Sequence, residues 1–353
     1  MFKTLNHQIR IRHVRNLRVL QLDGGGFLGY VFFDALEVLE TNCGHGRLCE
    51  AFDLIYGTST GAIIGAALAA GASVAEIREL YTQHGDYIFK PVNSWWLPWR
   101  RINRPLYDRN RVIDPLTRIL EKYGVTKMRD LKTRFVAVTV NECEKVNVFL
   151  KSWYAEFADL DVTEAVARSF AALMYFGHVI DKKALTCYSD GATGTLNCAL
   201  MFSYFEAQDI AITNSRAVSS DDNAAMLGSN DPHVTDIDIY SFGCGTIPQP
   251  VPFSKVSKWG NIRQLWNTFL AKGQLLARIQ SVQDQVRALN WIRVPQMTNP
   301  NYKGTRVHLM RIDSALPDKL NVIDKPKYIK EYAAIGAATA MKRAESLKFY
   351  DNN

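Results

Sequence analysis

Long apolar runs are missing from this sequence. No stretch of its 353 residues approaches the length of about 18 uncharged apolar positions that a membrane-spanning helix needs. The first residues, MFKTLNHQIRIRHVRNLR, alternate basic and apolar side chains, so the continuous apolar segment of a signal peptide is missing as well. We therefore expect a protein that meets a membrane, if at all, from its surface.

Cysteines and clustered metal ligands are also scarce. The six cysteines form no C-x-x-C pair, and a chain of this length does not need disulfides for its stability. We therefore expect reduced thiols and a cytoplasmic protein. No group of His, Asp and Glu residues has the spacing of a metal site, so the sequence predicts neither a metal ion nor a cofactor.

The composition indicates a globular protein with a mild excess of positive charge. Hydrophobic residues make up 47% and charged residues 22%, which excludes a disordered chain. The formal charge of +7 permits attraction to anionic surfaces, of which we expect a lipid surface and no nucleic acid. Because the chain has no internal repeat and no convincing boundary, we expect a single domain over residues 1–353.

Strand-like and helical segments alternate along the chain. Helical patterns follow the first two strands, and a turn-rich stretch at 215–235 predicts a surface loop. The alternation predicts an α/β fold with a mostly parallel sheet covered on both faces. We expect strands at 19–22, 52–56, 135–140, 146–150 and 237–242 with a strand-like stretch at 306–310, and helices at 62–71, 163–173, 262–291 and 327–348.

One serine stands between two glycines at the end of a strand. Gly57-Thr58-Ser59-Thr60-Gly61 fits the pattern G-x-S-x-G, in which a strained strand-to-helix turn exposes the serine hydroxyl. Gly57 and Gly61 would then be small because the neighbouring strand and helix pass close by. The alternative is a tight turn whose serine only caps a helix.

A glycine-rich loop precedes this serine and permits two interpretations. Gly24, Gly26 and Gly29 fit the dinucleotide pattern G-x-G-x-x-G between a strand and a helix. Against that, Asp23 would bring a carboxylate next to a pyrophosphate, and Asp53 stands at the wrong end of the second strand to bind a ribose. Bare backbone N–H groups can also form an oxyanion hole, which suits a serine that follows in the sequence.

A base for the serine is sought among one aspartate and three histidines. Asp190 ends a strand-like segment and is followed by Gly191, although an Asp-Gly pair is also a common turn. His178, His233 and His308 are the alternatives, and a lone histidine is more often structural than catalytic.

These pieces together resemble the patatin-like phospholipase family. Its D-G-G-G-x-x-G loop, G-x-S-x-G elbow and D-G-[GA] motif occur here in order at 23–29, 57–61 and 190–192. Connecting segments such as 164–169 and 241–246 are also similar, so the resemblance covers about 18–246. It implies a three-layer α/β/α fold with a mostly parallel central sheet, in which 247–353 is a helical C-terminal completion.

The resemblance also implies roles for residues. Ser59 is the nucleophile of a Ser–Asp dyad and Asp190 is its base. The N–H groups of Gly24, Gly25 and Gly26 form the oxyanion hole. The chain departs from the family at Leu28, where many members carry Arg or Lys, so any role of that charge in steadying the loop must be absent or supplied elsewhere.

The activity that the resemblance implies is hydrolysis of the acyl esters of membrane phospholipids, of the phospholipase A type. Some bacterial members of this form are effectors of antiphage signalling that cyclic nucleotides activate, and we carry such an activator as a hypothesis, together with a homo-oligomer. The competing hypothesis is a nucleotide-binding protein that uses the glycine-rich loop without hydrolysis.

A segment rich in tryptophan and arginine gives an independent indication of a membrane partner. Trp95 and Trp96 are followed by Arg100 and Arg101. Indole rings favour the bilayer interface and arginine binds lipid phosphate, so we expect these residues to contact the membrane. The alternative is a packed loop or a subunit contact.

Overall fold

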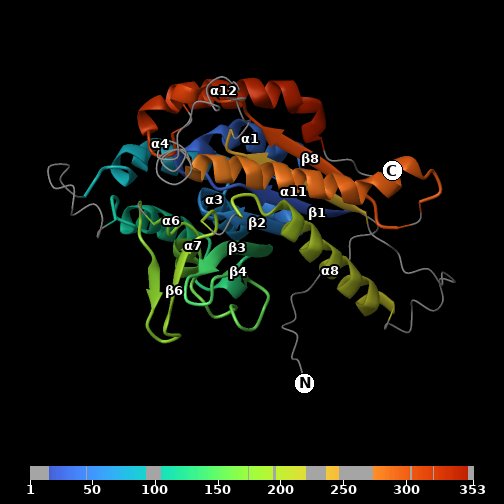
Figure 1. The fold of residues 1–353 in the computed structure, drawn as a ribbon, viewed down its shortest axis with the longest axis horizontal. Helices are drawn as coiled ribbons and strands as arrows, with labels where there is room; N and C mark the ends of the chain where they lie inside the picture. The colour runs from blue at the N-terminus through green and yellow to red at the C-terminus, as the bar shows by residue number, and fades with distance from the viewer. Residues whose placement is uncertain are drawn as a thin grey trace, which may run out of the picture.

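A mixed sheet of eight strands forms the centre of the molecule (Figure 1). The computed structural model describes residues 16–44, 46–92, 105–173, 175–193, 196–219, 236–245, 273–302, 304–320 and 322–348. The strands are β1 Leu17–Leu22, β2 Leu54–Thr58, β3 Arg134–Asn141, β4 Val146–Lys151, β5 Val179–Asp181, β6 Thr186–Asp190, β7 Ile237–Gly243 and β8 Val307–Asp313. They are arranged in the order β5-β6-β3-β2-β1-β7-β8, with β4 also paired to β3.

The strands in the middle of the sheet are parallel, whereas those around β3 include antiparallel pairs. β2, β1, β7 and β8 pair in parallel, and so do β2 and β3. β4 and β6 run antiparallel to β3, and β5 runs antiparallel to β6. Every residue of β1, LRVLQL, is buried, as expected for a central strand covered on both faces.

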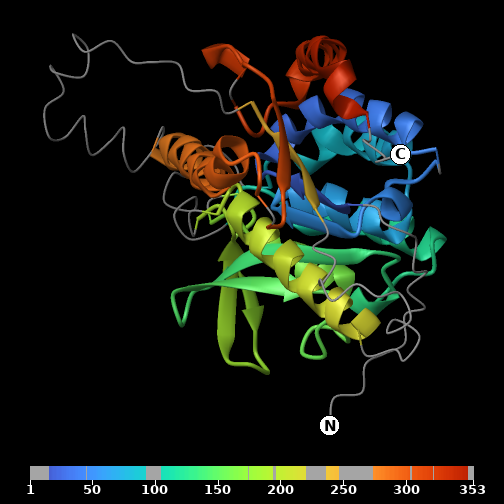
Figure 2. The same cartoon turned by 90° about the vertical axis from the view of Figure 1, so that its right-hand side faces the viewer.

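Helices connect the strands and cover both faces (Figure 2). The α-helices are α1 Phe33–Asn42, α2 Leu48–Ala51, α3 Thr60–Ala70, α4 Val74–Ile88, α6 Asn110–Lys122, α7 Val162–Ser169, α8 Leu200–Ser219, α11 Gly273–Thr298 and α12 Ile329–Arg343. The 3-10 helices are η1 Gly26–Phe32, η2 Met128–Asp130, η4 Asp318–Leu320, η5 Pro326–Tyr328 and η6 Ala344–Leu347.

Two hydrophobic cores lie on the two faces of the sheet. Leu20 and Ile55 belong to the core shared with α1, α3, α4 and α12. Val19 and Tyr56 belong to the core shared with α8 and α11. This alternation along adjacent strands is the pattern of a sheet between two helical layers, so the predicted three-layer α/β fold is confirmed.

Several element predictions need correction. Helix α8 continues to Ser219, into the stretch expected to be a loop at 215–235, and 220–235 lies outside the described residues. The segment 247–353, expected to be a helical completion, also contributes strand β8 to the sheet, at the strand-like stretch expected at 306–310. Helix α7 begins at Val162 with Asp161 at its N-cap, rather than with Thr163 as the cap.

The predictions about a membrane concern residues that the structure describes only in part. Trp95, Trp96, Arg100 and Arg101 lie in 93–104, which the structure does not describe. Within the described part of the chain, no helix combines the length and hydropathy that crossing a membrane requires.

Candidate functional site

The elbow serine is held in a strained backbone conformation. Ser59 follows β2 directly and precedes α3, with φ 55° and ψ −120°, a region that non-glycine residues rarely adopt. A Cβ on Gly57 would lie 2.4 Å from the carbonyl oxygen of Gly61, and one on Gly61 would lie 2.3 Å from that of Leu22. Both positions therefore require glycine, as the predicted elbow demands.

Strand β3 brings the predicted base to this serine. Along one edge, β3 pairs with β2 as far as Val138, which faces Thr58, and then with β6 from Thr139, which faces Asp190. The ends of β2 and β6 therefore meet at consecutive residues of β3. A Cβ on Gly191 would lie 3.1 Å from Cγ2 of Thr58, in agreement with this register. Ser59 and Asp190, far apart in the sequence, lie together.

Ser169, at the end of α7, ties the turn at Ser59 to strand β3. Its hydroxyl accepts the Ser59 N–H at 3.0 Å and donates to the Val138 carbonyl at 2.6 Å. Asp190 is 3% exposed, and its Oδ1 accepts the N–H of Ala192 at 2.8 Å. The Asp190 carboxylate is thus nearly buried, and one of its oxygens is held by the turn that follows it.

The glycine loop lies against Ser59, but its first N–H group is already used. Gly24 donates to the carbonyl oxygen of Asn197 at 3.0 Å. In this conformation Gly24 is therefore not a free oxyanion donor, contrary to the expectation from its motif. A Cβ on Gly24 would lie 2.7 Å from Oδ1 of Asn197 and 3.1 Å from Cβ of Ser59. The absence of a side chain at Gly24 thus allows the loop to pack closely against Asn197 and Ser59. Gly25 and Gly26 stay the predicted oxyanion donors.

Residues late in the chain support the back of this loop. Gly26 has φ +58°, and a Cβ there would lie 2.4 Å from the carbonyl oxygen of Ile323. The same carbonyl accepts the N–H of Phe27 at 2.7 Å. The segment after β8 therefore fixes the turn from the glycine loop into η1.

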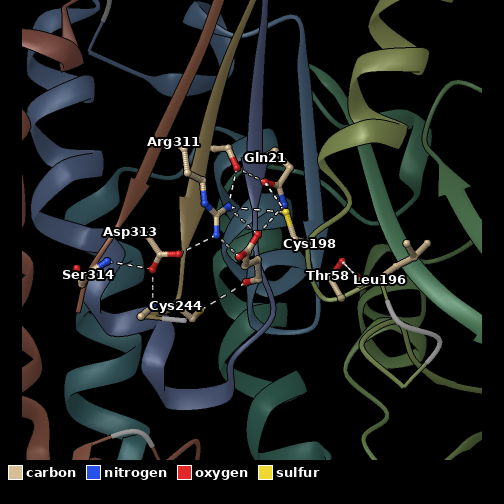
Figure 3. A network of polar contacts seen from close by, with 11 residues as sticks. Gln21, Thr58, Leu196, Cys198, Cys244, Arg311, Asp313 and Ser314 are labelled. Atoms are coloured by element: carbon tan, nitrogen blue, oxygen red, sulfur yellow. Dashed lines mark hydrogen bonds and ion pairs between the residues drawn. The ribbon is translucent and has the colours of Figure 1, made fainter. Parts of the chain in front are cut away.

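A buried ion pair joins the start of the glycine loop to β8 (Figure 3). Leu28 is fully buried in the core, but Arg311 of β8 reaches the Asp23 carboxylate with Nη1–Oδ1 at 3.1 Å and Nη2–Oδ2 at 2.5 Å. Arg311 also donates to Oγ of Ser241 at 2.7 Å and to Oδ2 of Asp313 at 3.0 Å. Burial disfavours the charged guanidinium, but the Asp23 carboxylate outweighs it and raises the pKa of Arg311 well above its usual value.

The structure also places the residues on which the alternatives rest, namely a dinucleotide site at the glycine loop and a histidine as the base. The Asp23 carboxylate is paired with Arg311, so its charge is no longer an argument against a bound pyrophosphate. Asp53 precedes β2 and accepts the N–H of Arg18 at 2.8 Å, which gives it a structural role instead. His178 is exposed, His308 lies near the start of β8, away from the strand ends at Ser59, and His233 lies outside the described residues.

Metal chemistry has no evident site in the described part of the chain. No group of three His, Cys, Asp and Glu side chains there could hold a metal ion. The six cysteines are free thiols.

Comparisons with known proteins agree with the motifs. The family model for patatin-like phospholipases matches residues 20–201, more than half of the chain, so the protein belongs to the patatin-like phospholipase family. The chain is 49% identical over 67 residues to the cUMP-AMP-activated phospholipase of Escherichia coli, covering 19% of this chain and 21% of that one. It is 28% identical over 272 residues to patatin of Solanum tuberosum, covering 69% and 65%.

A solved structure is also similar over most of the chain. VipD from Legionella pneumophila aligns with 94% of this chain and 67% of its own, at 12% identity and a TM-score of 0.42. The matches to the curated relatives from Escherichia coli and Solanum tuberosum each span less than two thirds of that relative's length.

Proposed function

We propose that this protein is a lipid acyl hydrolase in which Ser59 and Asp190 act as a dyad. The observation that carries the proposal is the meeting of β2 and β6 at consecutive residues of β3, which brings the elbow serine to a buried aspartate. Family membership supports an ester of a lipid as the substrate. The phospholipid acyl ester, cleaved as in a phospholipase A, is the substrate that we propose.

The proposed reaction has two steps. Ser59 Oγ attacks the ester carbonyl while Asp190 takes its proton, and the N–H groups of Gly25 and Gly26 stabilise the oxyanion. The lysophospholipid leaves with the proton held by Asp190, and the acyl group stays on Ser59. Water then attacks the acyl-enzyme, again with Asp190 as the base, and fatty acid is released.

Two substitutions test the dyad. Ser59→Ala should lose both labelling by a fluorophosphonate probe and release of fatty acid from phospholipid vesicles, by several orders of magnitude. Asp190→Asn keeps the size of the side chain but removes the base, so its hydrolysis should fall similarly. His178→Gln and His308→Gln are the controls and should keep most of the activity. If a histidine variant were as inactive as Asp190→Asn, the enzyme would use a catalytic triad and the dyad proposal would be wrong.

We further propose that the enzyme is cytoplasmic, associates with the membrane surface and responds to a cyclic nucleotide in antiphage defence. The support for the activator is the 49% identity over 67 residues to a relative described as cUMP-AMP-activated. Fatty-acid release should be measured with and without a panel of cyclic dinucleotides, and a rate that none of them changes would remove the activator from the proposal. The competing function, nucleotide binding without hydrolysis, predicts binding that Ser59→Ala leaves intact and no released fatty acid.

A further inference from the structure

Asn197 has a buried side-chain amide without a hydrogen-bond partner. Asn197 is 1% exposed, and neither Oδ1 nor Nδ2 finds a partner among the residues that the structure describes. Its main chain is engaged, because its carbonyl oxygen accepts the Gly24 N–H at 3.0 Å. Buried polar side chains are normally paired, so an unpaired amide requires an explanation, and a role in ligand binding or catalysis is one.

The amide lies beside the elbow serine. Oδ1 of Asn197 and Cβ of Ser59 are 2.7 and 3.1 Å, respectively, from the point that a Cβ on Gly24 would occupy. The preceding residue is also fixed to the elbow strand, because the Thr58 hydroxyl donates to the carbonyl of Leu196 at 2.9 Å, a contact drawn in Figure 3. Asn197 is therefore positioned through its carbonyl oxygen and its neighbour, whereas its side-chain amide has no partner among the described residues.

The Asn197 amide lies beside Gly24, the predicted oxyanion donor whose N–H group is already used. The Gly24 N–H is bound to the Asn197 carbonyl, which leaves two of the three predicted glycine donors for an oxyanion. The end of an asparagine side chain can turn about its last torsion, which exchanges the places of Oδ1 and Nδ2. Nδ2 would then face the glycine loop, near the carbon that bears the serine hydroxyl.

We propose that Asn197 is a catalytic residue whose Nδ2 donates a hydrogen bond to the oxyanion formed when Ser59 attacks an ester. The inference depends on the proposed hydrolase function and extends it. A side-chain amide can serve as an oxyanion donor alongside backbone N–H groups, and it is most effective when it is already held in place in a site that excludes water. Asn197 thereby takes the part assigned to Gly24 by the motif.

The test compares Asn197→Ala with the unmodified enzyme on a dispersed short-chain ester. Loss of one oxyanion donor lowers kcat about 10²–10³-fold, and we expect this loss with little change in KM. A trifluoromethyl ketone, which forms an oxyanion with the serine, should inhibit the variant correspondingly less well. An ether phospholipid that cannot be cleaved should bind equally to both. A role in packing alone would not separate these two ligands.

Two further variants make the test decisive. Asn197→Asp keeps the size of the side chain but replaces the donor by a carboxylate, so it should be at least as impaired as Asn197→Ala, and it tests the donor even where Asn197→Ala does not fold. The matched control is Asn147→Ala, because Oδ1 of Asn147 on β4 is also buried without a partner but lies outside the site. We expect kcat of that control within about twofold of the unmodified enzyme.

The possible outcomes distinguish this inference from the proposed function. If folded Asn197→Ala and Asn197→Asp keep full kcat and full inhibition by the ketone while Ser59→Ala is inactive, the donor role is wrong and the dyad stands. If Ser59→Ala itself keeps its activity, the proposed function fails, and the donor role with it.

Discussion

Replacing the single residue Arg311 should destabilise the glycine loop through the loss of its ion pair with Asp23. Arg311→Met leaves the Asp23 carboxylate, which is fully buried, without its cation. Breaking one side of a buried ion pair costs about 3–5 kcal/mol, so the free energy of unfolding should fall by that order and kcat should fall with it. Arg311→Lys keeps the charge but not the two-pronged contact, and should be intermediate. Urea denaturation and ester hydrolysis measure both effects.

The control for this prediction is Arg78→Met. Arg78 contacts Asp34 and Glu37 through partly exposed groups, and pairs of this kind contribute about 1 kcal/mol or less. That variant should lose little stability and no kcat. In a double-mutant cycle, Asp23→Asn and Arg311→Met should be strongly non-additive. Additive losses would show that the two residues act separately.

Single residues also mark the limit of prediction from the sequence. Ser59, Gly57 and Gly61 could be predicted because the elbow is a local motif whose spacing carries its geometry. Ser169, Asn197 and Arg311 could not, because each acts through a contact between distant segments, such as the Arg311–Asp23 pair with a separation of 288 residues. The D-G-G-G motif likewise could not reveal that one of its N–H groups is bound to Asn197.

Helix α4 offers a test at the scale of one element. Ser73 accepts the Glu76 N–H at 3.2 Å, and Glu76 accepts the Ser73 N–H at 2.8 Å, which is a complete capping box. Burial would raise the pKa of Glu76, but hydrogen bonds from Lys122, Tyr123 and Ser73 outweigh it and lower this pKa from 4.5 to about 2.

A carboxyl group whose pKa is lower in the folded state stabilises the protein above its unfolded pKa. This contribution of Glu76 should therefore be complete above about pH 5 and should disappear as the pH falls from 4.5 towards 2. Glu76→Gln should be less stable than the unmodified protein by about 1 kcal/mol near neutral pH, and the difference should shrink on acidification. Denaturation curves at several pH values measure it, and a difference independent of pH would contradict the prediction.

Element boundaries could be predicted to within a few residues where the periodicity was strong. The apolar run at 135–138 marks β3 directly as a buried strand, because a strand covered on both faces needs few polar residues. β1 and β7 are equally buried but include polar residues such as Gln21 and Asp238. The end of α8 was harder to predict, since the residues after 215 favour turns locally. β8 was indicated only as a strand-like stretch at 306–310, because its exposed and half-buried side chains at the sheet edge weaken the apolar pattern.

The charge of the whole molecule leads to a prediction about membranes. With a formal charge of +7, the protein should bind anionic vesicles more weakly as salt is added. Changing Arg100 and Arg101 together to Gln should weaken this binding, at about 1 kcal/mol for each residue, while hydrolysis of a dispersed ester changes little. Trp95→Ala or Trp96→Ala should act in the same direction. Equal losses on vesicles and on the dispersed ester would place these residues at the site or in the core instead.

The support of the glycine loop by the end of the chain has a consequence for the time course of synthesis. A ribosome that has translated as far as residue 246 has already made Ser59, Asp190 and the glycine loop, but neither Arg311 nor the Ile323 carbonyl that binds Phe27. At about 5–20 residues per second, the loop stays unsupported for several seconds more. For a protein proposed to cleave the lipids of the cell that makes it, a nascent or prematurely ended chain would carry both members of the dyad and still be inert.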